Sequence, residues 1–469
     1  MKQHDAPLLK IRQMSWAIPF LSLLLFSCQQ TTGTSETVET TAPPDTVAVQ
    51  AGQLSDEALL DTLQRQTFRY FWEGAEPTSG MARERYHEDG EYPQKDRNVV
   101  TTGATGFGVM AILVGIEREF ITREEGFKRL KQIADYLEKA DRFHGAWPHW
   151  LQGETGKVKP FSQMDDGGDL VETAFLVQGL LTVRQYFVNG NEQEKALAAQ
   201  ITKLWEGVDW NWYRNKQNAL FWHWSPKYGW KMNFPVRGYN ECLIMYVLAA
   251  SSPTHGVPAE VYHEGWARNG DIRANVELYG HKIVLDHQGE KGSVGPLFWA
   301  HYSYLGLDPR GLQDRYADYW EHNRNHTLIH YDYALENPKG FKGYGENSWG
   351  MTSSYSPKGY AGHSPTRDLG VITPTAALSS FPYTPDESMK VARYLYGDLQ
   401  KKVIGEFGPY DAYSETEDWF PKRYLGIDQG PIVVMVENHR SGLLWDLFMS
   451  APEVQNGLRK LGFESPHLK

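Results

Sequence analysis

The feature that most constrains the fold is an alternation of two kinds of helical segment along the chain. Residues 122–140 place apolar side chains at helical spacing opposite a charged face, which is typical of a helix half in water. The neighbouring segments 105–116 and 170–187 are apolar on nearly every side, which indicates burial between other helices. This order is expected of a ring of antiparallel helical hairpins, in which inner helices line a core and outer helices shield it.

The contrast recurs toward the C-terminus, in the segments 192–208, 241–250, 373–379, 385–399 and 430–449. At roughly 65 residues per hairpin with its loop, about 400 residues give about six hairpins. We therefore predict an all-α fold, an (α/α)6 toroid of helical hairpins that forms a single domain over residues 54–469. An α-solenoid is the structural alternative, but we find no sequence repeat of fixed period.

The first 53 residues are predicted to lie outside that domain. Basic residues precede an apolar stretch at 17–26 that is too short to cross a bilayer as a mature helix. The sequence LFSC that follows resembles a bacterial lipobox, so we predict a lipoprotein signal peptide at 1–27 and lipidation of Cys28. A plain secretory signal is the alternative. Residues 28–53 are rich in Thr, Ser, Glu and Pro, which predicts a disordered tether.

The leader predicts export of the protein and attachment to the outer membrane through the lipid alone. Gln29 is not the acidic residue associated with retention at the inner membrane, and no acidic run for surface export follows Cys28. The periplasmic face is therefore favoured over the cell surface. The other cysteine, Cys242, lies in the predicted apolar helix and is expected to be an inert core thiol.

Composition narrows the choice of partner. The chain carries a net charge of -11 and no Lys- or Arg-rich run, which argues against nucleic acid as a ligand. Its 16 Trp, 26 Tyr and 20 Phe are more rings than a core needs, so some are expected to form a binding surface. We expect a neutral, polar ligand, no cofactor, no metal and a monomeric protein.

The densest group of acids stands where the buried segment 170–187 begins. It contains Asp165, Asp169 and Glu172, and helical spacing puts the last two on one side of the helix. Crowded carboxylates push their pKa values apart, which lets an acid and a base coexist at neutral pH. The alternative is a purely structural role as a capping box, with Asp169 at the N-cap and Glu172 at N3. A calcium loop is a second alternative, but the EF-hand spacing is missing from this sequence.

Two further acids open buried helices. An aromatic loop at 222–230 leads to Glu241, and Asp428 begins the last apolar segment. Rings stack on the CH faces of a sugar while polar groups satisfy its hydroxyls, so a ring-rich loop before a carboxylate predicts a sugar subsite. Glu241 as a simple partner of the helix dipole is the alternative. Predicted substrate-binding residues in such loops and helix starts are Trp72, Arg85, Trp147, His149, Trp224, Tyr228, Trp230, Arg237, Tyr239, Glu346, Trp349 and Trp419.

Several strings together resemble the bacterial endo-β-1,2-glucanase family of glycoside hydrolases, whose domain is often labelled glucoamylase-like. They are YFWEGA at 70–75, SGMARER at 79–85, TTGATGFG at 101–108, DDGGDLVETA at 165–174, RGYNE at 237–241 and IDQGP at 427–431. The resemblance implies an (α/α)6 toroid and hydrolysis of β-1,2-glucan to sophorose or short sophorooligosaccharides. It assigns candidate catalytic carboxylates to Asp165, Asp169, Glu172 and Glu241.

The favoured hypothesis is therefore an inverting hydrolase of β-1,2-glucan. Glu241 is the expected general acid, while Asp169, Glu172 or Asp428 would orient or deprotonate the attacking water. An inverting pair stands roughly 6.5 to 9.5 Å apart. The alternatives are a hydrolase of another glucan linkage, a glycan-capturing lipoprotein without catalysis, and a polysaccharide lyase, which would need a basic site centred on Tyr and His. Endo and exo action are not distinguished.

Overall fold

The computed structural model describes residues 54–468, which belong to one compact unit. The predicted signal peptide, the predicted lipidation site at Cys28 and the predicted tether lie outside the described residues. Within residues 54–468, no helix combines the length and hydropathy that crossing a bilayer requires.

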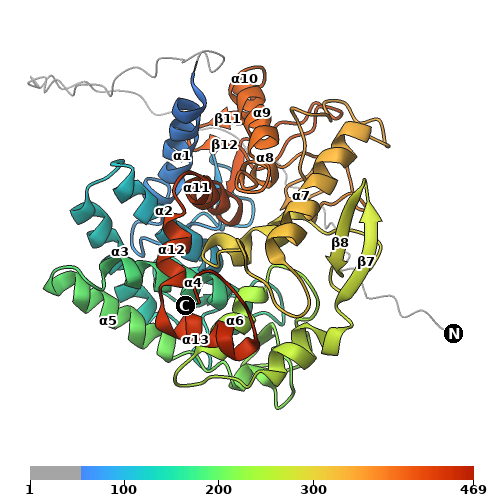
Figure 1. The fold of residues 1–469 in the computed structure, drawn as a ribbon. Coiled ribbons are helices and arrows are strands. Elements are labelled where there is room, and N and C mark those ends of the chain that lie inside the picture. Colours follow the sequence, from blue (N-terminus) through green and yellow to red (C-terminus); the bar gives the residue numbers. More distant parts are fainter. Residues whose placement is uncertain (1–53, 469) are drawn as a thin grey trace, which may run out of the picture. The chain divides into compact units, whose positions relative to one another are not determined.

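The fold is an (α/α)6 toroid with an inner and an outer layer of helices (Figure 1). The inner segments are α2 (Thr102–Glu117), α4 (Leu170–Phe187), α6 (Leu243–Ser251), η5 (Leu297–Ala300) with η6 (Tyr302–Leu305), α8 (Pro374–Leu378) and α11 (Gly426–Arg440). The outer segments are α1 (Asp56–Trp72), α3 (Arg123–Lys139), α5 (Glu192–Glu206), η3 (Val261–Trp266), α7 (Tyr319–Glu336) and α9 (Pro385–Tyr396). Shorter helices complete the chain: η2 (Trp212–Arg214), η4 (Arg268–Gly270), α10 (Gln400–Val403), α12 (Leu443–Met449) and α13 (Pro452–Leu461).

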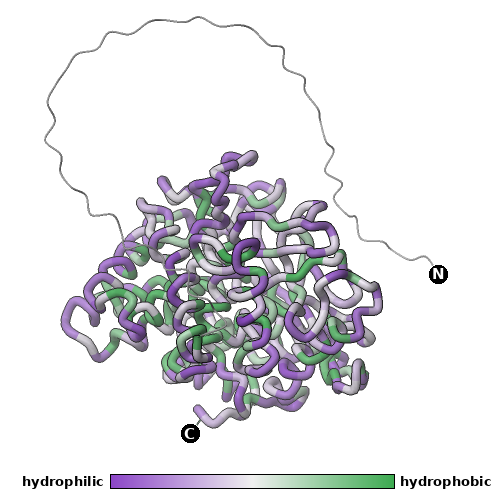
Figure 2. Tube along the Cα trace, turned by 90° about the horizontal axis from the view of Figure 1, so that it is seen from above, coloured by the Kyte–Doolittle hydropathy of each residue, from purple (hydrophilic) through white to green (hydrophobic). Residues whose placement is uncertain are grey.

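The two layers follow from the two kinds of sequence. In α3, a capping box between Thr122 and Glu125 starts the helix, and only its apolar stripe is buried. In α2, every residue from Thr102 to Ile116 is buried. Hydrophobic residues accordingly concentrate inside and polar ones at the rim (Figure 2). The predicted alternation of buried and half-exposed helices is confirmed.

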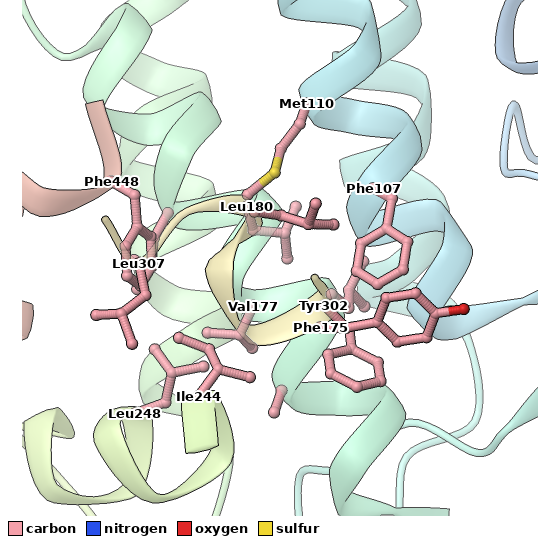
Figure 3. Close-up of a cluster of buried hydrophobic side chains, with 14 of the residues drawn as sticks. Phe107, Met110, Phe175, Val177, Leu180, Ile244, Leu248, Tyr302, Leu307 and Phe448 are labelled. Carbon is pink, nitrogen blue, oxygen red and sulfur yellow. The ribbon is translucent and has the colours of Figure 1, made fainter. Parts of the chain in front are cut away.

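The inner helices α2 and α4 cross in close contact. A Cβ atom on Gly106 would lie 2.2 Å from the carbonyl oxygen of Phe175, and one on Gly179 would lie 2.0 Å from the carbonyl oxygen of Gly106, so only glycine fits at either position. Beside this crossing, the ring of Phe107 packs on the rings of Phe175 and Tyr302 (Figure 3). The core is therefore continuous from α2 through α4 to η6.

Two predicted segments differ from the structure. The apolar segment 241–250 becomes helical only at Leu243, because the Asn240 side chain accepts a hydrogen bond from the Cys242 N–H and Glu241 precedes the helix. Segment 430–449 is two helices, because Gly442, with φ +77°, separates α11 from α12. Cys242 is a buried free thiol, as expected.

Short antiparallel strands connect the loops. The pairs are β1 (Arg85–His87) with β13 (Arg423–Leu425), β2 (Val99–Thr101) with β3 (Trp150–Gln152) and then β4 (Val158–Lys159), β5 (Gly168–Asp169) with β6 (His223–Trp224), β7 (Arg273–Leu278) with β8 (His281–Leu285), β9 (Ser353–Ser354) with β10 (Ala361–Gly362), and β11 (Ile404–Gly405) with β12 (Gly408–Pro409). Strands β2, β5 and β13 lead directly into α2, α4 and α11. Their pairing therefore holds the N-terminal ends of three inner helices beside the long loops.

Candidate active site

Asp169 is the best-connected acid of the site. Its Oδ1 accepts the N–H of Glu172 at 2.9 Å, which makes it the N-cap of α4. Its Oδ2 accepts the indole N–H of Trp222 at 2.9 Å and lies 3.0 Å from Nδ1 of His149. The pairing of β5 with β6 brings Trp222 to this place. Both oxygens of Asp169 are thus occupied by protein donors.

The side chain of Glu172 does not complete a capping box. Its Oε2 instead accepts the N–H of Gly103 at 2.8 Å, across the gap between α4 and α2. A Cβ atom at position 103 would lie 2.3 Å from that oxygen, so glycine is required for the contact. The capping alternative therefore holds for Asp169 and fails for Glu172.

His149 is the cation at the centre of these acids. In addition to its contact with Asp169, its Nδ1 lies 3.9 Å from Asp165 Oδ2, and its Nε2 lies 3.9 Å from Glu172 Oε1. Burial acts to lower the pKa of His149, but the three carboxylates together raise it to about 10. Burial raises the pKa of Glu172 to about 7 and that of Asp165 to about 6, against the opposing charge of His149. The site therefore holds an imidazolium at neutral pH.

One group within residues 54–468 could hold a metal ion by geometry: His149, Asp165 and Asp169, whose ligand atoms lie within 4.8 Å of one another. The contact of 3.0 Å between His149 Nδ1 and Asp169 is a charge-assisted hydrogen bond. A metal ligand must be a neutral imidazole with a free lone pair. The protonated His149 serves as the counter-ion of these acids.

Glu241 is buried, with 5% of its surface exposed, and its Oε2 has no hydrogen-bond partner among the described residues. Ser303 of η6 holds the backbone by donating its hydroxyl to the Glu241 carbonyl and accepting the N–H of Ile244. Burial raises the pKa of Glu241 to about 7, and the charge of Asp169 contributes. A large part of this carboxyl is therefore protonated at neutral pH, as a general acid requires.

Asp428 lies in the first turn of α11. Its Oδ1 accepts the hydroxyl of Tyr302 at 3.4 Å, and its Oδ2 has no partner in the described part of the chain. Burial raises the pKa of Asp428 well above its usual range, and the negative charge of Asp411 adds to the shift. Sequence reasoning missed Asp411, which lies inside a long loop with no helix start beside it.

Electrostatic coupling connects the two halves of the site. Beyond burial, the charge of Glu84 contributes to the raised pKa of Glu172 on one side and of Asp428 on the other. Glu84 reaches this position because β1, which follows it, pairs with β13 at the start of α11. Asp165, Glu172 and Glu241 therefore each feel the charge of Asp169, and Asp428 is connected to this group through the charge of Glu84.

Exposed rings border this region. Phe161 is 48% exposed and stacks on His149 with 4.2 Å between ring centroids. Phe234 is 46% exposed and packs on Trp222 at 5.5 Å. Because His149 and Trp222 both contact Asp169, the two rings lie at the edge of the acid cluster. Sequence reasoning missed both rings.

The predicted ring-rich loop forms an aromatic cluster. The half-buried Trp224 and Trp230 both pack on Trp212, at 6.1 and 6.2 Å between ring centroids. Tyr228 lies beside Gln163, 3.5 Å from its amide nitrogen, in the loop that carries Asp165. Arg237 is exposed on the approach to Glu241.

Three predicted substrate-binding rings are core residues, and the prediction for them is wrong. Trp147, Tyr239 and Trp349 are 0% exposed and have no surface to offer a sugar. Their polar atoms bond inside the protein, to the Leu137 carbonyl, the Asn323 side chain and the Glu387 carbonyl. Two other residues predicted to bind substrate contact outer helices instead. Trp72 packs on Arg129 of α3, and Glu346 forms an ion pair with Lys390 of α9.

A cavity of about 720 Å³ adjoins Asp411, within the range of small-molecule sites. Its lining includes Arg85, Tyr355, Tyr360, Trp419, Phe420 and Arg423. The N–H of Tyr355 donates to Asp411 Oδ2 at 2.8 Å, which connects the cavity to the acids. Arg85 and Trp419, both predicted to bind substrate, thus lie in one concave surface.

Comparison with known proteins shows which family this chain resembles. The family model named Glycoamylase, which describes glucoamylases, matches residues 233–452. The structure of an endo-β-1,2-glucanase from Chitinophaga pinensis, in complex with sophorotriose and glucose, is 66% identical, covers 88% of this chain and 100% of its own, and superposes with a TM-score of 0.88. An endo-β-1,2-glucanase from Talaromyces funiculosus, 11% identical over 88% of this chain and 93% of its own, shares the fold with a TM-score of 0.64.

A curated relative is the exo-β-1,2-glucooligosaccharide sophorohydrolase of Parabacteroides distasonis, 45% identical over 434 residues, which are 89% of this chain. This chain spans 59% of the length of that relative. The helical toroid with buried carboxyls at the N-terminal ends of inner helices is a fold that glycoside hydrolases adopt. The chain belongs to the bacterial β-1,2-glucanase family of glycoside hydrolases, with a glucoamylase-like domain.

Proposed function

We propose that this protein hydrolyses β-1,2-glucan to sophorose or short sophorooligosaccharides, with inversion at the anomeric carbon. The observation that carries the proposal is the pair of buried carboxyls, Glu241 and Asp428, each with an oxygen that no other described residue occupies. Glycoside hydrolysis needs two such groups, one to protonate the leaving oxygen and one to take a proton from water. The relatives named above act on, or bind, β-1,2-linked glucosides.

Glu241 is the general acid in this proposal. Burial raises its pKa to about 7, so a proton is available near neutrality, and its Oε2 is free to reach the glycosidic oxygen. The side-chain N–H of Gln could still donate a hydrogen bond but not a proton. Glu241→Gln is therefore the matched variant for this role.

Asp428 is the proposed acceptor of the water proton. The two other candidates are less suited, because both oxygens of Asp169 accept protein hydrogen bonds and Oε2 of Glu172 accepts one from Gly103. In this assignment Asp169 and Glu172 position the site, with His149 as their counter-ion. Asp165 has an oxygen without a partner among residues 54–468 and joins them through His149.

The decisive experiment is incubation with linear β-1,2-glucan, with products followed by chromatography and anomeric configuration by NMR. We expect sophorose or short oligomers of inverted configuration, and a loss of kcat of about 100-fold or more in Glu241→Gln. Full activity in that variant would refute the assignment of the acid. Binding without products would favour the glycan-capturing alternative. Unsaturated products that absorb ultraviolet light would indicate a lyase.

We also propose that the protein is a monomer, exported and attached to the outer membrane by lipid on Cys28, facing the periplasm. The basic and apolar leader with its LFSC sequence supports this. Cys28→Ser should release the protein from the membrane fraction and abolish incorporation of labelled palmitate. Light scattering of the soluble domain would test the monomer, and protease treatment of intact cells would test the face.

A further inference from the structure

Four buried histidines lie directly behind the segment that carries Glu241, and we refer to them as the histidine cluster. His322, His326 and His330 stand at four-residue intervals on α7, on one face of that helix, and His287 comes from the loop after β8. All four are 2% exposed or less. The ring centroids of His287 and His326 are 4.6 Å apart, and those of His326 and His330 are 5.3 Å apart. The cluster therefore connects the loop after β8 to the buried face of α7.

Three histidines of the cluster hold the peptide of Gly295, just before η5. The Gly295 N–H donates to Nδ1 of His287 at 2.9 Å, so that nitrogen carries no proton. The Gly295 carbonyl oxygen lies 2.8 Å from Nε2 of His326 and 2.9 Å from Nε2 of His330. A carbonyl oxygen only accepts hydrogen bonds, so both Nε2 atoms are protonated donors. These contacts therefore fix the proton positions of three rings and hold both polar groups of one peptide.

The cluster reaches Glu241 first through Tyr239, which stands two residues before it. The ring of Tyr239 packs on His322 at 4.3 Å and on His287 at 4.8 Å between centroids. Its hydroxyl donates to the side-chain oxygen of Asn323 at 2.7 Å, and its backbone pairs with the residues on either side of His287. The segment before Glu241 is therefore held against the cluster by a ring, a hydroxyl and the backbone.

A second connection runs through the chain after Gly295. A Cβ atom on Gly295 would lie 2.1 Å from the ring of Trp299, so this glycine packs directly against η5. In η6, which follows, Ser303 donates its hydroxyl to the Glu241 carbonyl and accepts the N–H of Ile244 at 3.0 Å. Oε2 of Glu241 has no partner among residues 54–468, so its placement depends on how firmly this backbone is held.

We propose that the histidine cluster positions the general acid, because it holds the backbone of Glu241 from one side through Tyr239 and from the other through η6. The role in hydrolysis rests on the proposed function above. The histidines are positioning residues: their bonded nitrogens face Gly295, and they exchange no proton with the glucan. By keeping this loop closed, the cluster also keeps the Glu241 carboxyl buried, and burial is what raises its pKa.

Two substitutions at His287 test the proposal. His287→Leu removes the acceptor of the Gly295 N–H, whereas the side-chain oxygen of His287→Asn can take the place of Nδ1. On sophorooligosaccharides we expect His287→Leu to lower kcat about tenfold or more with KM within about twofold, and His287→Asn to keep kcat within about threefold of wild type.

The pH profile separates positioning from a loss of folded protein. A loosened loop admits water to Glu241 and lowers its pKa, so the basic limb of the kcat–pH profile of His287→Leu should move down by about half a unit or more. Partial unfolding would lower the rates without moving the limb. His363→Leu, the same change at another histidine that is 0% exposed, should leave the limb in place.

A second readout needs no substrate. In protein labelled with ¹³C at the Glu carboxyls, the signal lost in Glu241→Gln identifies Glu241, and its titration should shift down in His287→Leu and not in His287→Asn. If His287→Leu did not fold, His326→Leu would replace it, with His326→Gln as the control that still donates to Gly295. An unmoved Glu241 titration in the folded Leu variant would overturn the proposal. A shifted titration in a protein that does not cleave β-1,2-glucan would refute only the proposed function.

Discussion

Gly103→Ala changes one hydrogen atom of the site to a methyl group, and its effect follows from the contact between α2 and α4. The new Cβ would lie 2.3 Å from Glu172 Oε2, whereas ordinary contact begins at 3.4 Å, so the carboxylate must move by about 1 Å. The movement breaks the 2.8 Å hydrogen bond from the Gly103 N–H. A hydrogen bond to a charged acceptor contributes about 1.5 to 3 kcal/mol.

This substitution has two opposing effects on stability, but only one effect on activity, which is a loss. Alanine in a helix is more stable than glycine by about 0.5 to 1 kcal/mol, which offsets part of the lost hydrogen bond. A displacement of about 1 Å within a catalytic constellation can lower activity about 100-fold. We therefore expect kcat/KM on sophorooligosaccharides to fall 10- to 100-fold, while Tm falls by a few degrees at most.

The assay compares steady-state kinetics and thermal unfolding of Gly103→Ala with those of Gly292→Ala. A Cβ on Gly292 has no neighbour within 4 Å, so this control should keep wild-type kinetics. Wild-type kcat/KM in folded Gly103→Ala would refute the idea that Glu172 must stand at this position. Loss of activity that merely tracked unfolding would refute the local explanation as well.

Three further predictions follow from the charges and rings of the site. Burial raises the pKa of Glu241 from 4.5 to about 7, so ionising this buried carboxyl lowers the stability of the folded protein as the pH rises through that range. Glu241→Gln removes this cost. Denaturant titration should therefore show the variant to be more stable than wild type by about 3 kcal/mol at pH 8 and no more stable at pH 4.5. His149→Gln should lower Tm most below pH 6.5 and lose this effect toward pH 10, because the raised pKa makes the imidazolium stabilising only while it stays protonated. Phe161→Ala and Phe234→Ala should raise KM several-fold with little change in Tm, whereas Tyr279→Ala, another exposed ring, should leave KM unchanged; equal KM values in all three would exclude sugar stacking at the acid cluster.

Some elements could be predicted because their signals are local. Helix α4 runs from Leu170 to Phe187, as the sequence predicted, since Asp169 caps its start and an unbroken apolar run follows. Helix α3 was equally clear from its charged face, and the structure adds a capping box at its start. The start of α6 was misjudged at Glu241, because the competing bond from Cys242 N–H to the Asn240 side chain leaves no trace in hydropathy.

The exposure of the aromatic side chains could not be predicted from local sequence patterns. Trp147 and Trp224 stand in similar aromatic, polar loops, yet the first is fully buried under α3 contacts and the second is half exposed. Phe161 and Phe234 look like ordinary apolar residues in the sequence, and only their stacking on His149 and Trp222 marks them. Exposure of a ring depends on which segment packs over it, which is a property of the fold.

The sequence by itself determined the helical toroid, the order of its layers and the acids that open its inner helices, because periodicity and capping act over a few residues. Only the tertiary structure decided which of those acids keep an oxygen without a hydrogen bond from the protein. Pairing of β5 with β6 brings Trp222 to Asp169, and the close contact of α2 and α4 gives Glu172 its donor. The charge of Asp411, in the loop before α11, adds to the raised pKa of Asp428. Proton affinity depends on burial and on neighbours distant in sequence, so the chemistry of these carboxyls exists only in the folded chain.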